Sequence, residues 1–167
     1  MQKIKTIHNL DRVSIQKDDF DLNEEISRLH DQDARVGAVC SFIGVVRDRS
    51  AQGIQTVKKL ELEHYPEMTH TAIEEMIDKA MNRFDIIGAR VVHRIGVLEL
   101  NEQIVLVAVT SAHRGESFKA CEFLMDYLKT QAPFWKKEWT TEGARWVDAR
   151  ESDDAALVKW GIHSKNV

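Results

Sequence analysis

The segment IVLVAVTSA, residues 104–112, is the most apolar stretch of the 167-residue chain. Its β-branched side chains are typical of a buried strand. A second such stretch, VGAVCSFIGVVR (36–47), also predicts a buried strand. Buried strands must be covered by other elements, so the remaining segments decide the fold class.

Several further segments have the patterns of strands. VKKLELEHY (57–65) alternates apolar and charged side chains, which predicts a half-exposed strand. ARVVHRIGVL (89–98) predicts one continuous strand. FWKKEW (134–139) and ARWV (144–147) flank the turn TTEG, so we expect a hairpin there. Short turns between neighbouring strands favour a largely antiparallel sheet.

Helical spacing marks three other segments. A short helix capped near Asp21 would place Leu22, Ile26 and Leu29 on one face. A longer helix is expected from Pro66, a favoured first helical residue, to before Gly88. A third is expected over 117–130, ended by Pro133. Two long helices among several strands predict the α+β or mixed α/β class, and the α+β class is the one we expect.

The length suits one domain with a real core. We expect residues 1–150 to form a single catalytic domain, and residues 151–167 to form a charged, partly flexible tail. The net charge of −4 argues against a general nucleic-acid binder, although it leaves room for a local basic pocket.

The chain lacks an apolar run of 18 residues and lacks the pattern of a signal peptide at its start. Cys40 and Cys121 are 81 residues apart without a C-x-x-C motif, so neither a disulfide framework nor a zinc site is expected. His64 and His70 have a poor spacing for two ligands on one helix. We therefore expect a cytoplasmic protein with free, buried cysteines, no metal and no cofactor.

The common hydrolase and nucleotide-binding motifs are missing from the sequence. Basic residues instead stand at the ends of apolar strands: Arg47 and His113–Arg114 each close one, and His93–Arg94 lies within its own strand. Such residues are often solvated strand ends. Alternatively, the strand ends converge on one pocket, where two arginines and a histidine would bind a phosphate or carboxylate.

Two lysines flank Pro133, where the predicted helix ends. Lys129 lies in the last turn of its helix, and Lys136 lies beyond the proline. If both side chains enter one pocket, each disfavours the charging of the other, and such a lysine can act as acid, base or nucleophile. Strand alternation puts Lys136 and Lys137 on opposite faces, so Lys137 is the less certain member of the site.

Six motifs, spread over roughly residues 20 to 160, resemble those of the large, catalytic subunit of molybdopterin synthase. They are FIGVVR (42–47), LELEHYPEMT (60–69), VVHRIGVLE (91–99), VTSAHR (109–114), MDYLKTQAPFWKKE (125–138) and GARWVDARE (143–151). The last two are long and chemically unusual, so the resemblance is specific.

The resemblance implies an α/β hammerhead fold with an additional antiparallel β subdomain. It implies a homodimer that binds a small ubiquitin-like sulfur-carrier subunit on each side, giving a heterotetramer. The carrier's C-terminal Gly-Gly ends in a thiocarboxylate. Two sulfurs would pass from it to cyclic pyranopterin monophosphate and form the dithiolene of molybdopterin.

The resemblance also assigns residues. Lys129 and Lys136 match the catalytic lysines. The matching substrate-binding positions are Val45, Val46, Arg47, His113, Arg114, Lys129, Lys136, Lys137 and Glu138, and the positions near the pocket are Phe42, Met125 and Arg150. Val45 stands where the family often has a lysine, which removes one possible contact. The resemblance suggests that some of these residues complete the pocket across the dimer.

Two other functions remain open at this point. The first is a lysine-based lyase or isomerase that acts on a phosphorylated carbonyl compound without a protein partner. The second is a non-catalytic scaffold that presents basic strand ends to an acidic protein tail. A requirement for the carrier separates the synthase from the first, and loss of activity on neutralising the lysines separates it from the second.

Overall fold

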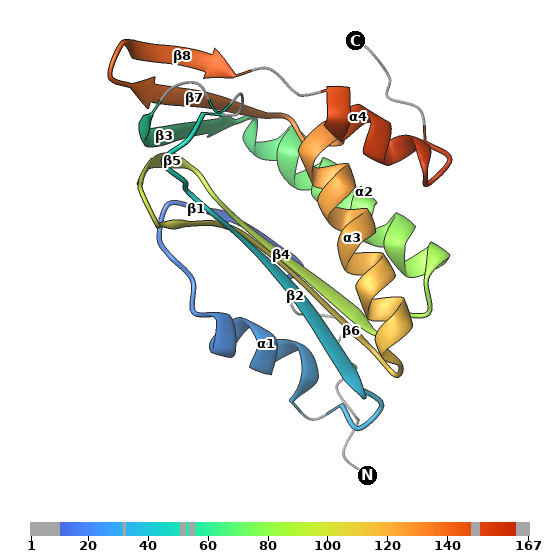
Figure 1. Ribbon diagram of the computed structural model, residues 1–167. Helices are drawn as coiled ribbons and strands as arrows, with labels where there is room; N and C mark the ends of the chain where they lie inside the picture. The colour runs from blue at the N-terminus through green and yellow to red at the C-terminus, as the bar shows by residue number, and fades with distance from the viewer. Residues whose placement is uncertain (1–10, 32, 51–52, 54–55, 148–150, 163–167) are drawn as a thin grey trace.

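The computed structural model describes residues 11–31, 33–50, 53, 56–147 and 151–162 (Figure 1). Two four-stranded sheets and, in these described residues, four helices confirm the α+β class. The first sheet has the spatial order β1 (Val13–Gln16), β4 (Gly88–Arg94), β6 (Gln103–Ser111) and β2 (Ala38–Val45). The second has the order β5 (Gly96–Glu99), β3 (Val57–His64), β7 (Phe134–Thr140) and β8 (Gly143–Val147).

The strand pairing is largely antiparallel, as the sequence predicts. β1 and β4 form the parallel pair, and β1 is a strand that the sequence patterns did not predict. In the centre of the first sheet β6 pairs with both β4 and β2, which buries it as expected. β2 lies at the edge of the sheet, so one side of its backbone has no neighbouring strand in the described residues.

The helices cover both faces of the first sheet (Figure 1). α2 (Pro66–Arg83) and α3 (Arg114–Gln131) pack on one face, where Ile73, Leu124 and Val107 are fully buried in one cluster. α1 (Leu22–His30) packs on the opposite face against Val92 and Leu106. None of these helices combines the length and apolarity needed to cross a bilayer, within the described part of the chain.

The helix boundaries follow local chemistry. The Asp21 carboxylate accepts a hydrogen bond from the Glu24 N–H at 2.9 Å and caps α1, as predicted. Pro66 is the first residue of α2. α3 begins at Arg114, three residues earlier than the spacing of apolar residues indicated.

The C-terminal region contains α4 (Glu151–Val158), which packs beside α3 (Figure 1). Leu157 is fully buried in the main core, and Trp160 packs against it. Residues up to Ile162 therefore contact the same core as the rest of the chain. The domain division at residue 150 stays a prediction.

The prediction of one strand over residues 89–98 is wrong. The segment forms β4 and β5, which belong to different sheets. Gly96 has φ of 84°, a left-handed conformation that glycine adopts without the clash of a Cβ atom. This residue lets the chain leave the first sheet and enter the second. The β7–β8 hairpin is present as predicted.

Candidate active site

A cavity of about 610 Å³ lies where the two sheets meet the C-terminal end of α3. Its apolar lining includes Phe42, Met125 and Leu128. Its basic lining consists of Arg47, Arg49, Lys129 and Lys136. We call this space the basic cavity. A volume of this size is typical of sites for small molecules.

Three separate elements supply the cations. Arg47 and Arg49 follow the end of β2, Lys129 lies in the last turn of α3, and Lys136 lies on β7. Lys129 is exposed and Lys136 is half-buried. A lysine at the C-terminal end of a helix is stabilised by the helix dipole, which helps to hold Lys129 in place.

The turn between α3 and β7 brings the two lysines together. The buried Thr69 hydroxyl on α2 donates a hydrogen bond to the Pro133 carbonyl at 2.9 Å and fixes the turn. β7 begins at the next residue, and alternation along it directs Phe134, Lys136 and Glu138 to the cavity. The proline break therefore converts a helix end and a strand start into one site.

Glu138 is the carboxylate in this lining. It is 2% exposed, and Arg145 on β8 donates a hydrogen bond to it at 3.4 Å. Its negative charge lies in the same cavity as Lys136. The cavity therefore keeps a strong excess of positive charge, which suits an anionic ligand.

Lys137 lies on the other face of β7. Its Nζ is 3.9 Å from the Glu61 carboxylate and lies over the rings of Trp139 and Trp146, at about 5 Å from each centroid. These contacts hold it outside the lining of the basic cavity. The expected contact of Lys137 with substrate therefore finds no support in the geometry of one chain.

The predicted convergence of strand ends is wrong within one chain. β2 and β6 are antiparallel, with Ala38 opposite Ser111 and Val45 opposite Gln103. Arg47 follows one end of this pair, whereas His113 and Arg114 follow the other. Both His113 and Arg114 are exposed at the N-terminal end of α3, which is the end farther from Lys129.

Some of the remaining expected positions line the basic cavity, and another packs in the core beside it. Phe42 and Val45 line the cavity, as does Met125. Val46 is 1% exposed and packs in the core beneath β3. Arg150 lies outside the described residues.

His93 lines the cavity, although the sequence analysis gave it no place among the site residues. It is buried on β4 and stacks on Phe134 with ring centroids 3.8 Å apart. Burial lowers the pKa of His93 to about 4, so the imidazole is neutral. The sequence feature that could have indicated a buried His93 is its position inside a strand, directly after Val91 and Val92.

The adjacent Arg94 has a structural role. Its guanidinium donates hydrogen bonds to the carbonyl oxygens of Lys17, at 3.0 and 3.1 Å, and of Gln103, at 3.1 Å. It points to the opposite side of β4 from His93, because successive side chains of a strand alternate. Arg94 thus ties the end of the first sheet together and does not contribute to the basic cavity.

The cysteines are not among the lining residues of the cavity, and they lack the setting of reactive thiolates. Cys121 is buried, and burial raises the pKa of its thiol to about 12, with a further contribution from Cys40. Cys40 is half-buried against the same core. A protonated, buried thiol is a poor nucleophile, so sulfur transfer through Cys121 is disfavoured.

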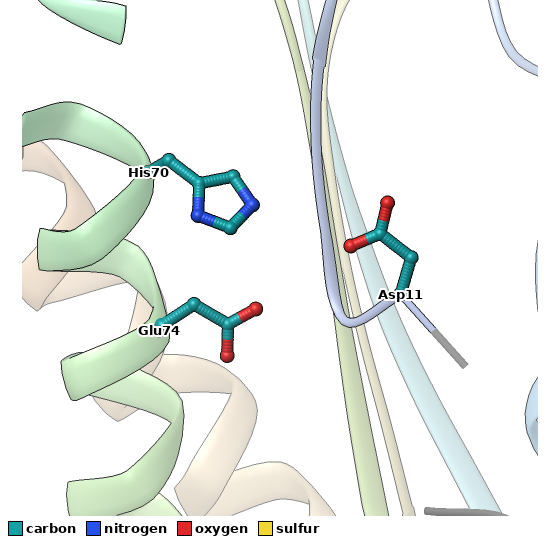
Figure 2. Close-up of side chains that lie close together, drawn as sticks. All are labelled: Asp11, His70 and Glu74. Carbon is teal, nitrogen blue, oxygen red and sulfur yellow. The ribbon is translucent and has the colours of Figure 1, made fainter. Parts of the chain in front are cut away.

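A second group of polar side chains lies away from the cavity. Asp11, His70 and Glu74 bring three potential ligand atoms within 4.8 Å of one another (Figure 2). Arg12 donates a hydrogen bond to Glu74 at 2.8 Å and another to Asp78 at 2.9 Å. This guanidinium already neutralises the Glu74 carboxylate and would repel a cation. We interpret the group as an ion-pair network that holds β1 against α2.

Comparison with known proteins gives consistent matches. The family model described as "MoaE protein" matches residues 15–131. The molybdopterin synthase catalytic subunit of Ralstonia nicotianae is 56% identical over 155 residues, which cover 92% of this chain and 86% of that protein.

Solved structures are similar over most of the chain. The molybdopterin biosynthesis MoaE protein from Burkholderia ambifaria is 49% identical with a TM-score of 0.78, covering 92% of this chain and 100% of that one. The structure of molybdopterin synthase from Staphylococcus aureus is 28% identical with a TM-score of 0.73, covering 83% and 98% of the two chains.

Proposed function

Because the chain belongs to the MoaE protein family, we propose that it is the large, catalytic subunit of a molybdopterin synthase. It would transfer sulfur from the C-terminal thiocarboxylate of a small ubiquitin-like carrier to cyclic pyranopterin monophosphate, forming the dithiolene of molybdopterin. The observation that carries this proposal is the presence of Lys129 and Lys136, from two different elements, in one cavity rich in cations.

The lining of the basic cavity suits such a substrate. A cyclic phosphate is an anion, and arginine and lysine side chains bind phosphate oxygens by charge-assisted hydrogen bonds. A flat heterocycle needs apolar and aromatic surface, which Phe42, Met125 and Phe134 provide. The lining therefore offers separate places for the charged and the flat parts of the substrate.

We assign the lysines different roles. Each sulfur displaces an oxygen of the substrate, which opens the cyclic phosphate, and water then hydrolyses the bond between this sulfur and the carrier's carbonyl carbon, returning the carrier's carboxylate. Protons must therefore reach the departing oxygens. Lys129 would act closest to the reacting carbons, as proton donor or through a transient bond. Lys136 would stabilise the phosphate and the developing negative charge, together with Arg47 from the same lining.

We propose that a second copy of the chain completes the site. The edge strand β2 is apolar, and Val39, Phe42 and Val45 are 39 to 48% exposed. Such an edge is a template for pairing with another strand. In a two-fold symmetric, antiparallel pair, the Ala38 end of one β2 lies beside the Val45 end of the other.

This pairing explains the separation of the basic residues. His113 and Arg114 lie near the Ala38 end of β2, and Arg47 lies beyond its Val45 end. Pairing across the edge would carry the partner copy's His113 and Arg114 towards Arg47 and the basic cavity. The homodimer would then bind one carrier subunit at each of two cavities, giving a heterotetramer.

We place the reaction in the cytoplasm. Cys40 and Cys121 are both free, which is the usual state of thiols in a reducing compartment. A thiocarboxylated carrier would deliver sulfur there without help from either cysteine.

Reconstitution tests the proposed function. The purified protein is mixed with preformed thiocarboxylated carrier and cyclic pyranopterin monophosphate, and product is measured by mass spectrometry of the two added sulfurs. We expect product that depends on both the carrier and its thiocarboxylate. Turnover without carrier would instead support a lyase or isomerase, and the absence of product despite carrier binding would contradict the proposal.

A further inference from the structure

His93 is a polar side chain in the basic cavity to which the proposed mechanism gives no task. It is 7% exposed, and its ring packs flat against Phe134 with an interplanar angle of 17°. Both side chains line the cavity. A buried polar group normally has partners for its hydrogen-bonding atoms, so each nitrogen of His93 needs an account.

The first nitrogen defines the tautomer. Nδ1 lies 2.8 Å from the backbone carbonyl oxygen of Arg94. A carbonyl oxygen accepts hydrogen bonds and cannot donate them, so Nδ1 carries the proton of the neutral ring. Burial keeps the pKa of His93 at about 4, against the raising effect of this hydrogen bond. Nε2 is therefore an acceptor with a free lone pair.

The second nitrogen, Nε2, is the one left for a ligand. Among the described residues, none is hydrogen-bonded to Nε2 of His93. The His93 side chain is 7% exposed, so it is buried but not sealed off completely. Because His93 lines the basic cavity, a ligand that fills this space lies against its ring.

We propose that His93 binds the substrate, with Nε2 accepting a hydrogen bond from an N–H or O–H group of the heterocycle. This inference rests on the proposed function and adds an orientation to it. Phosphate oxygens that have lost their protons are acceptors, so they would repel a second acceptor at Nε2. The phosphate would therefore lie towards Arg47 and the lysines, and a donor edge of the ring would lie against His93 and Phe134.

His93 would also give the site specificity. A buried acceptor left without a donor is costly, so ligands that present only acceptors at this point should bind weakly. An N–H-rich heterocycle satisfies the acceptor. Inorganic phosphate does not need Nε2 of His93, because the arginine and lysine side chains of the lining bind its negative charge.

The test compares binding of cyclic pyranopterin monophosphate and inorganic phosphate to three forms of the full-length protein: wild type, His93→Phe and His64→Phe. His93→Phe keeps a flat ring against Phe134 and removes Nε2. We expect it to weaken substrate binding by about tenfold, the effect of one buried neutral hydrogen bond. His64→Phe is the matched control, since His64 also stacks near Phe134, at 6.4 Å, but lies outside the cavity lining.

Binding of inorganic phosphate is the control that separates a loss of substrate recognition from general damage to the cavity. The dissociation constant of inorganic phosphate should be the same for wild type, His93→Phe and His64→Phe. If His93→Phe fails to fold, His93→Gln and His93→Asn replace it: the glutamine amide oxygen reaches the position of Nε2, whereas asparagine ends near Nδ1. We then expect near-normal substrate binding with glutamine and weak binding with asparagine.

The outcomes distinguish a failure of the role of His93 from a failure of the proposed function. Equal substrate affinity of wild type and His93→Phe, or of the glutamine and asparagine variants, would overturn the role of His93 while reconstituted sulfur transfer stands. Equal weakening of phosphate and substrate would also overturn it, because it would indicate a collapsed cavity. Absence of sulfur transfer by wild type with carrier would instead refute the proposed function.

Discussion

At the scale of single residues, burial decides what each basic side chain does. His93 and Arg94 are neighbours in sequence, yet one lines the cavity as a neutral ring and the other binds backbone carbonyls as a cation. Arg47 and Lys129 keep their exposure and are available to a ligand. Residue type alone would have grouped all four as cations.

The buried His93 links stability to pH. Its pKa falls from 6.5 to about 4 on folding, so the unfolded chain takes up a proton at a higher pH than the folded protein does. The contribution to stability is fully present above pH 6.5 and is lost as pH falls towards 4. It amounts to roughly 3 kcal/mol, as an upper estimate from the pKa difference.

Urea unfolding of wild type and His93→Phe between pH 7 and pH 4 measures this effect. The free energy of unfolding of wild type should fall more steeply across this window than that of the variant. Carboxylates contribute equally to both profiles and cancel in the comparison. Parallel profiles would show that His93 is not held neutral.

At the scale of elements, Gly96 separates the two sheets. A Cβ atom at this position would meet no close neighbour except Lys17 Cγ at 3.9 Å, so space is available. The positive φ of 84° is the constraint, and an L-residue there costs about 1–2 kcal/mol. Gly96→Ala should therefore lower the free energy of unfolding by about that amount.

Gly115 provides the matched control for this substitution. It lies in the first turn of α3 with nothing within 4 Å of the added Cβ and without a positive φ. Gly115→Ala should leave stability unchanged or raise it slightly, because alanine favours the helix. Equal effects of the two substitutions in urea unfolding would contradict the role assigned to Gly96.

Most elements could be predicted from local patterns. The helix after Pro66 and the hairpin from Phe134 have strong signals in capping and alternation, and both are present. β1 is four residues long and depends on its parallel pairing with β4, which no local pattern reveals. The division of 89–98 was missed because the apolar pattern continues through Gly96, while the chain direction changes there.

At the scale of the whole molecule, the proposed site extends over two copies of the chain. Lys129 and Lys136 meet because a short turn joins their elements, so sequence reasoning could place them together. His113 and Arg114 end at the opposite end of α3, and no sequence pattern shows which strand ends a second copy will bring together. His93 was missed because its role depends on which side of β4 faces the cavity.

Mixed dimers test the completion of the site by a second copy. Lys129→Ala and Arg114→Ala homodimers should both be nearly inactive. After subunit exchange, a mixed dimer would have one cavity with both wild-type residues, so about a quarter of all cavities should regain activity. No recovery, with exchange verified by native mass spectrometry, would place both residues in the same chain's cavity. An active Arg114→Ala homodimer would leave Arg114 outside the site.

The proposal that the basic cavity and its Lys129 perform the reaction is tested most directly by single-turnover sulfur transfer from preformed thiocarboxylated carrier. Wild type is compared with Lys129→Ala and with Lys119→Ala, which removes an exposed lysine ten residues earlier on the same helix. We predict that Lys129→Ala slows the chemical step by at least about a hundredfold, the effect expected for a general acid, while Lys119→Ala keeps the wild-type rate. A near-normal rate for Lys129→Ala would contradict the claim that this cavity and its lysine perform the reaction.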